Sequence, residues 1–283
     1  MSLQDQASVN HRVWETEDHV ADYSDRSLAP VEMVILLRYR DELSRRVLEA
    51  GCGAGRVLGY LIELGGQVHG IDLSPAMVEF CRASYPAADV RVGDVSTLSR
   101  QLTEPFDAIF APNNLIDVFD DTARRAVLDE FNRSLVDGGL LIFSSHNLDE
   151  REPSTGPGEP DSLPRRLASL VVKALHKPPA DVVQRAVRLP IARRNRRRLA
   201  PLEVATSEYA IVNDETFDYS LLHYYVRRDA QERQLAERGF QLLECLDADT
   251  RAVHSGEKSA SPWLHYIARK TGGNPPNAHD DPH

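Results

Sequence analysis

The sequence predicts an α/β fold in which a parallel sheet is covered by helices on both faces. Short apolar runs, typical of buried strands, alternate with longer stretches that have helical periodicity. Strands and helices that alternate in this way are joined by right-handed crossovers and build a doubly wound sheet. The alternation stops after the fifth expected strand and resumes near residue 228. We therefore expect an α/β core that is interrupted once by an insertion.

Length and composition are typical of a globular protein. The chain has 283 residues, enough for one large α/β domain or two small ones, and 42% of them are hydrophobic. No apolar run approaches the ~20 residues that a membrane span needs, and the polar residues 1–18 do not resemble a secretory signal. The three cysteines form no C-x-x-C pair, which favours reduced thiols and a cytoplasmic location. The ten histidines show no ligand spacing, so we expect no metal.

The first half of the chain contains five expected strands and the helices between them. Residues 1–20 look loosely ordered, and a helix is expected to begin at Pro30. Ser74 is expected as the N-cap of a later helix, with Pro75 in its first turn. The strands are expected at 46–50, 67–72, 90–92, 106–111 and 139–145, and the helices at 55–64, 74–85 and 122–135.

The second half starts with an insertion and then returns to the alternating pattern. A loop rich in proline and glycine (152–164) precedes two basic amphipathic stretches, 163–175 and 180–198. An unstructured loop of this length is uncommon inside a compact domain, so we expect a helical insertion. The later elements are expected as a hairpin (207–212 and 219–226), a helix (228–238), strands (241–246 and 263–269) and a disordered tail (271–283).

The inserted segment reverses the charge of the chain. The net charge is −10, yet residues 151–200 contain 12 Lys and Arg against 4 Asp and Glu, a net of +8. This pattern favours contact with an anionic substrate or a lipid surface, and a solvated basic face is an equally valid interpretation. The run at 193–198 lacks the interleaved aromatic residues of single-strand binding proteins, so no nucleic acid partner is expected.

Three glycines at every second position follow the first strand. Gly51, Gly53 and Gly55 let the backbone turn sharply and approach a ligand closely. The helix after them is expected to direct free amide groups toward that ligand. Asp72, at the end of the second strand, is placed to hold a ribose diol, although it could also cap the next helix. The pattern indicates a site for a nucleoside-containing cofactor.

Glu49, two residues before the first glycine, distinguishes between two kinds of cofactor. A nicotinamide dehydrogenase uses G-x-G-x-x-G, whereas this chain has G-x-G-x-G. A carboxylate at this position disfavours a pyrophosphate and favours a cofactor with a cationic amino acid end. S-adenosylmethionine has an ammonium and a sulfonium and no phosphate, so it fits Glu49.

The chain resembles the class I S-adenosylmethionine-dependent methyltransferases over residues 44–143 and again over 225–269. Their first motif, E/D-x-G-x-G-x-G, is matched by Glu49 and the three glycines. Asp72, in Gly70-Ile-Asp-Leu-Ser74, corresponds to the ribose-binding acid of that family. Asp94, in Val92-Gly-Asp-Val95, corresponds to the residue that meets the adenine amino group. The resemblance implies a Rossmann-like, doubly wound, mostly parallel sheet of seven strands with an antiparallel last strand.

The resemblance also implies a set of cofactor-binding residues and a division of the chain. The cofactor candidates are Glu49, Gly51, Cys52, Gly53, Gly55, Asp72, Leu73, Met77, Gly93, Asp94, Val95, Asn113 and Asn114. The expected regions are an N-terminal helical cap (1–45), a cofactor-binding core (46–147), a basic insertion and hairpin as a lid over the acceptor site (148–226), the completion of the core (227–270) and the tail (271–283).

His146 is the candidate general base, because it lies at the carboxyl end of the fifth strand, where ligands bind in open α/β sheets. A hydrogen-bonded structural histidine is an equally valid interpretation. The candidates for acceptor binding are Tyr23, His146, Asn147, His223, Tyr224 and Tyr225. We expect methyl transfer to a small or carrier-linked, anionic acceptor, at an oxygen. The alternative is a partner or regulatory protein that has the fold without catalysis.

Overall fold

The computed structural model describes residues 6, 10, 27–102, 104–151 and 179–272, with side chains from residue 188 onward in the last range. Its strands form one sheet in the order β3-β2-β1-β4-β5-β8-β7-β6, and β10 pairs with both β5 and β9. The strands are β1 (Arg46–Ala50), β2 (Gln67–Asp72), β3 (Asp89–Val92), β4 (Phe106–Ala111), β5 (Leu135–Asn147), β6 (Val204–Ala205), β7 (Tyr209–Val212), β8 (His223–Val226), β9 (Phe240–Asp247) and β10 (Trp263–Lys270).

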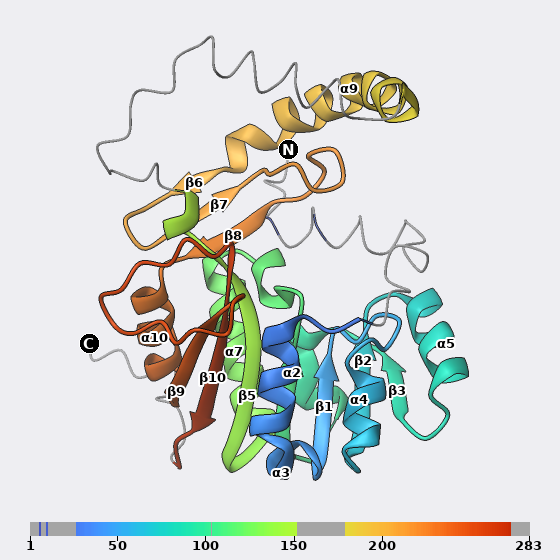
Figure 1. Ribbon diagram of the computed structural model, residues 1–283, viewed down its shortest axis with the longest axis vertical. Helices are drawn as coiled ribbons and strands as arrows, with labels where there is room; N and C mark the ends of the chain where they lie inside the picture. Colours follow the sequence, from blue (N-terminus) through green and yellow to red (C-terminus); the bar gives the residue numbers. More distant parts are fainter. Residues whose placement is uncertain (1–5, 7–9, 11–26, 103, 152–178, 273–283) are drawn as a thin grey trace, which may run out of the picture.

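Helices cover both faces of this sheet, as the alternating pattern predicts (Figure 1). One face packs against α2 (Pro30–Arg38), α3 (Arg40–Leu43), α4 (Leu58–Glu63) and α5 (Pro75–Ser84). The other packs against α6 (Leu98–Gln101), α7 (Asp121–Ser134) and α10 (Arg228–Glu237). Along β4, Ile109 and Ala111 belong to one core and Ala108 and Phe110 to the other, because successive side chains of a strand point to opposite faces.

The first five strands run parallel, and the predicted antiparallel last strand is confirmed. β1 pairs in parallel with β2 and β4, and β4 pairs in parallel with β5. β10 is antiparallel to both β5 and β9. The prediction of an α/β, mostly parallel fold is confirmed, but the sheet has ten strands and not seven, because β6, β7 and β8 of the inserted segment join the other seven.

The inserted hairpin joins this sheet. The predicted hairpin forms from β7 and β8, and β8 pairs in parallel with the end of β5 at His146 and Asn147. Helix α9 (Pro179–Leu199) lies beside the hairpin at the same end of the molecule (Figure 1). The basic stretch at 163–175 and the tail from residue 273 lie outside the described residues.

Several element boundaries differ from the prediction, among them the second strand of the hairpin, which begins at His223, and two of the differences have a clear physical reason. The helix after the glycines begins at Leu58, because residues 51–57 are used for turns. β5 begins at Leu135 and has 13 residues, because Gly138 adopts a positive φ of 76° and lets the chain continue pairing through an irregularity. Within the described residues, no helix is long and apolar enough to cross a membrane.

Candidate active site

The three glycines make a left-handed loop at the carboxyl end of β1. Gly51, Gly53 and Gly55 have φ values of 65°, 50° and 84°, a region that side chains disfavour. A Cβ atom on Gly51 would lie 2.7 Å from Leu115, and one on Gly55 would lie 2.7 Å from the Cys81 sulfur. A Cβ atom on Gly53 would meet nothing within 4 Å. The loop therefore closes against the protein at its two ends and is open at Gly53, where a ligand can approach.

Glu49 lies beneath this loop as a buried carboxyl group with an unsatisfied oxygen. The residue is 1% exposed, and its Oε2 atom has no hydrogen-bond partner. Burial raises the pKa of Glu49 well above its usual range. A buried carboxyl group without a partner is costly, and a cation beside it would compensate the charge. The residue thus fits the cationic end of the predicted cofactor.

Asp72 connects the glycine loop with the start of α5. Its Oδ2 accepts from the Gly53 amide and its Oδ1 from the Ser74 amide, each at 2.9 Å. Burial raises the pKa of Asp72, although these two hydrogen bonds oppose the shift. Ser74 caps α5 by accepting from the Met77 amide, as predicted. Since each oxygen of Asp72 retains a lone pair, the carboxylate fits a ribose diol.

The remaining cofactor candidates lie on neighbouring loops. Asp94 Oδ1 accepts from the Ser96 amide at 2.8 Å. Asp94 is thus the N-cap of the short helix η1 (Val95–Thr97). Gly93 has no room for a side chain, since a Cβ atom would lie 2.0 Å from the Gln101 side chain. Of the other candidates in this region, Cys52, Met77 and Val95 are buried and Leu73 is partly exposed.

Asn113 and Asn114 make a second left-handed turn, at the end of β4. Their φ values are 54° and 55°, a backbone conformation that is uncommon outside glycine and concentrates at functional sites. Asn113 Oδ1 accepts from Arg56 at 3.0 Å, which joins this turn to the glycine loop. Asn114 Nδ2 lies 3.3 Å from Nε2 of His146. The turn therefore connects the cofactor side of the site with His146.

His146 forms a dyad with Asp117, a residue that the sequence analysis did not select. The Nδ1 atom of His146 lies 2.7 Å from Asp117 Oδ2, and the His146 amide donates to the same oxygen at 2.6 Å. Asp117 follows the Asn114 turn in the short helix η2 (Leu115–Val118) and is fully buried. The dyad fixes the ring and leaves Nε2 on the side of Asn114.

A buried arginine, Arg124, favours the ionised form of Asp117 in this dyad. Arg124, from α7, forms an ion pair with Asp117 Oδ1, and Ser145 Oγ donates to the same oxygen at 2.8 Å. Although burial alone raises it, Arg124 and His146 hold the pKa of Asp117 below its usual value. Gln231 of α10 accepts from Arg124 at 2.5 Å and completes the network.

A second histidine–aspartate dyad faces the first. The Nδ1 atom of His223, on β8, lies 2.6 Å from Oδ2 of Asp214 in the loop before that strand, and Tyr225 OH donates to the same oxygen at 3.0 Å. The rings of His146 and His223 have their centres 5.0 Å apart, and those of His146 and Tyr225 lie 4.7 Å apart. Three predicted acceptor residues, His146, His223 and Tyr225, are therefore brought together.

Two predicted acceptor residues point away from this cluster, and one cannot be placed. Asn147 is buried, and its amide donates to the carbonyls of Ser259 and Ser261. Tyr224 is fully buried and donates from its hydroxyl to Asp121 at 2.5 Å. Asn147 follows His146 on β5, and Tyr224 lies between His223 and Tyr225 on β8. Successive side chains of a strand point to opposite faces of the sheet, so these two point away from the cluster. Tyr23 lies outside the described residues.

Two buried amides from the N-terminal region connect both dyads. Gln6 Nε2 donates to the carbonyls of Asp117 and Leu222, at 3.0 and 2.9 Å. Asn10 Nδ2 donates to Val118 and Leu222, and its Oδ1 accepts from the Leu222 amide at 3.0 Å. The prediction of loose order over residues 1–20 is therefore wrong at these two positions, which dock beside Asp117 and His223.

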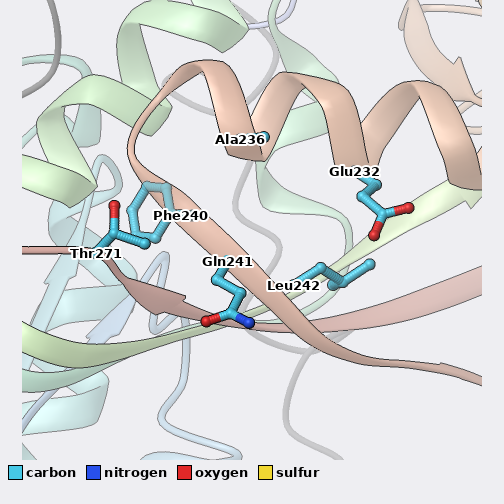
Figure 2. A pocket seen from close by; sticks show the side chains of 6 residues that line it. All are labelled: Glu232, Ala236, Phe240, Gln241, Leu242 and Thr271. Carbon is cyan, nitrogen blue, oxygen red and sulfur yellow. The ribbon is translucent and has the colours of Figure 1, made fainter.

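A separate surface depression lies between α10 and β9 (Figure 2). In the figure, Glu232 and Ala236 of the helix lie above Phe240, Gln241 and Leu242 of the strand. It is lined by none of the predicted site residues, and Glu232 pairs with Arg228. We assign it no function.

Residues 47–139 match the protein family described as "Methyltransferase domain". This match covers the strands that carry the glycine loop, Asp72, Asp94 and the Asn114 turn. Together with the fold, it defines the class of protein: residues 47–139 form a methyltransferase domain, in a chain whose fold is that of class I, S-adenosylmethionine-dependent methyltransferases, as its sequence predicts.

Among curated proteins, the chain is similar to O-methyltransferases of ubiquinone biosynthesis. The chain is 32% identical over 145 residues to the ubiquinone biosynthesis O-methyltransferase of Xanthomonas oryzae pv. oryzae, and 29% identical over 161 residues to that of Xylella fastidiosa. These alignments cover 50% and 52% of this chain and 59% and 64% of the relatives. The chain thus spans about three fifths of the length of the curated relatives it matches.

Solved structures share the fold over most of the chain. The CcbJ methyltransferase of Streptomyces caelestis has a TM-score of 0.56 at 15% identity and covers 91% of this chain and 97% of its own. The 1,6-didemethyltoxoflavin-N1-methyltransferase of Burkholderia thailandensis also has a TM-score of 0.56 at 15% identity, with coverages of 94% and 88%. At such identities the similarity is one of fold.

Proposed function

We propose that this chain transfers a methyl group from S-adenosylmethionine to a hydroxyl oxygen of a small-molecule acceptor, with His146 as general base. The observation that carries the proposal is the His146–Asp117 dyad. It lies at the carboxyl end of β5 and is joined to the glycine loop through Asn114, Asn113 and Arg56. The names of the curated relatives, which are O-methyltransferases, support oxygen as the accepting atom.

The cofactor residues would act by position and charge. Glu49 would pair with the ammonium of the methionine end, the open backbone at Gly53 would let the cofactor approach, and Asp72 would accept from the ribose hydroxyls. Asp94 would meet the adenine, whose ring would lie among Leu73, Met77 and Val95. When bound, S-adenosylmethionine supplies a methyl group already activated by its sulfonium, so the protein mainly aligns the acceptor and excludes water.

His146 is suited to take the acceptor proton. The Asp117 carboxylate holds Nδ1, so the lone pair of Nε2 is directed to the side of Asn114 Nδ2, which the acceptor hydroxyl would displace as its donor. The proton of the acceptor hydroxyl would move to Nε2 as the oxygen–carbon bond forms and the carbon–sulfur bond breaks, giving S-adenosylhomocysteine. The resulting imidazolium would be stabilised by the buried Asp117 carboxylate.

Replacement of His146 tests this role. His146→Ala should lower kcat by about 10²–10⁴-fold with little change in S-adenosylhomocysteine affinity, and added imidazole should restore part of the rate. The loss should be smaller for more acidic acceptor hydroxyls, which need less help in losing their proton. An unchanged kcat across acceptors of different acidity would refute the base role. The matched control is His254→Gln, at an exposed position outside the site.

A non-catalytic partner or regulatory role is the alternative function. The curated relatives are named as enzymes, and the dyad gives the chain a base, so we favour catalysis. Binding of S-adenosylhomocysteine without transfer of radiolabelled methyl to any acceptor in a lysate would favour the alternative.

We also propose that the inserted segment (148–226) forms a lid over an anionic or carrier-linked acceptor. We propose further that the protein is cytoplasmic and that this basic segment contacts lipid surfaces peripherally. The five arginines at 193–198 are exposed on α9. That helix is tied to the loop that carries Asp214, because Asn195 donates to the Asp218 carbonyl at 3.1 Å. Replacing these arginines by glutamine should weaken binding to anionic vesicles, and unchanged binding would make the segment a solvated face.

A further inference from the structure

Two histidines and one aspartate from separate elements meet at the acceptor side of the site. His146 lies on β5, His223 on β8, and Asp214 in the loop between β7 and β8. Each offers a ligand atom that lies within 4.8 Å of the ligand atoms of the other two. The two imidazole centres are 5.0 Å apart with an angle of 31° between the rings. Two imidazoles that share one tetrahedral zinc ion have ring centres roughly 5 Å apart, since zinc–nitrogen bonds are about 2.0–2.1 Å long.

The surroundings of His146 are those of a metal-ligating histidine. Such a histidine usually donates its other ring N–H to a carboxylate, which fixes the tautomer and aims the free nitrogen at the ion. Asp117 has this role for His146 at 2.7 Å, and Asp117 is itself held by Arg124 and Ser145. Because Asp117 occupies Nδ1, Nε2 is the ring nitrogen of His146 that remains for an ion, and a buried network fixes the orientation of the ring.

Asp214 supplies the anionic member of the set. It accepts from His223 at 2.6 Å and from Tyr225 OH at 3.0 Å, and the Thr216 amide donates to its other oxygen at 3.0 Å. A cation could therefore replace the proton between His223 and Asp214, with Tyr225 still donating to the carboxylate.

We propose that His146, His223 and Asp214 form a binding site for a zinc-like divalent cation, and that this cation inhibits methyl transfer. Two imidazoles, one carboxylate and an open fourth position match the ligand preference of Zn²⁺ and Co²⁺ over Mg²⁺ and Ca²⁺. The inhibitory part rests on the proposed function. The cation and the acceptor proton require the same lone pair on Nε2 of His146, so the two exclude each other.

Cobalt binding tests the site without any turnover. Titration of the chelator-treated, full-length protein with Co²⁺ should give one equivalent of intense visible absorption bands, typical of tetrahedral coordination. His223→Gln and Asp214→Asn should abolish the bands, while their thermal unfolding is recorded to confirm folding. Asp89→Asn is the matched control, because Asp89 pairs with His69 at 3.4 Å outside any three-ligand cluster in the described residues. Absence of bands in the wild-type protein, or bands that persist in both site variants, would overturn the proposal.

Methyl-transfer kinetics then test the competition. Zn²⁺ should raise the apparent KM for the acceptor at least tenfold without changing that for S-adenosylmethionine, and a chelator should restore it. A rate that increases with Zn²⁺ would overturn the inhibitory role. The two proposals fail differently. Activity that depends on His146 in a protein that binds no Co²⁺ refutes only the cation site, whereas Co²⁺ binding with activity independent of His146 refutes only the base.

Discussion

At the scale of single residues, the site is built from buried charges whose partners come from distant parts of the chain. Asp117 is buried with Arg124 and His146, while Glu49 is buried with one oxygen that has no partner. Breaking the first group would leave an uncompensated charge, which costs about 3–5 kcal/mol. Glu49 differs, because Arg56 and the Leu58 amide offset its burial only in part and one oxygen is left for a further donor or cation. If the cofactor binds as we propose, Glu49 is the residue at which cofactor binding and protonation are coupled.

We expect cofactor binding to release a proton from Glu49. Burial raises the pKa of this carboxyl group well above its usual range and thereby favours its protonated form in the free protein, whereas an ammonium beside it favours the ionised form. Calorimetry of S-adenosylmethionine binding in two buffers with different ionisation enthalpies measures the release. Glu49→Gln should abolish the release and weaken binding about tenfold or more, equivalent to ~1.4 kcal/mol. An observed heat that is independent of the buffer would contradict this prediction.

At the scale of elements, the end of β5 is where the acceptor side is assembled. His146 pairs with Tyr225 of β8 and with Trp263 of β10, so it has a neighbouring strand on each side. The N-terminal residues Gln6 and Asn10 tie η2 to the start of β8. The side-chain amides of Gln6 and Asn10 thus hold η2 and the start of β8, and with them the two dyads, in a fixed relative position.

Asn10→Ala should destabilise the protein by about 2–3 kcal/mol. The substitution leaves the carbonyl of Val118 and the amide of Leu222 without their partner in a buried environment, and the carbonyl of Leu222 loses one of its two donors. Urea unfolding measures the loss. Glu208→Gln is the control, because its ion pair with Arg233 is about half exposed on both sides and should change stability by less than ~1 kcal/mol. A variant as stable as the wild type would show that the N-terminal contact carries no stability.

The positions of the cofactor candidates in the fold were predictable from the sequence, and those of the acceptor candidates only in part. Each glycine and acidic residue of the cofactor motif lies at the end of a strand or within a few residues after it, so local pattern and spacing locate them. Asp117, Arg124 and Asp214 are joined to the histidines only through space, and no spacing indicates them. The period of two along a strand is a signal that could have separated His223 and Tyr225 from Tyr224, and His146 from Asn147.

At the scale of the whole molecule, one sheet supports both halves of the site and contains a buried histidine at its centre. His265 of β10 lies between β5 and β9 and is buried. Burial lowers its pKa to about 4, so it stays neutral in the folded protein. Protonation of this ring is therefore coupled to unfolding of the sheet.

Stability should decrease as the pH falls from about 6.5 to about 4. In this window the unfolded chain protonates His265 and the folded chain does not, so acid favours unfolding. The contribution is about 3 kcal/mol at most, since one pKa unit corresponds to ~1.4 kcal/mol. Urea unfolding across this range measures it, and His265→Leu should flatten the dependence. His254→Gln, at an exposed position, should leave the dependence unchanged. An identical slope in His265→Leu would assign the effect to other groups.

Strands β6 to β8 join the core sheet over a short length, since among the described residues β8 pairs with β5 at His146 and Asn147. Because the strand pairing that joins β8 to β5 is short, the inserted segment can change in length or sequence without altering the glycine loop and the acidic residues beside it. If the inserted segment recognises the acceptor as we propose, evolution can exchange it while the glycine loop and its acidic residues are inherited unchanged. Such modularity makes this strand end a natural junction for building chimeric enzymes with new acceptor preferences.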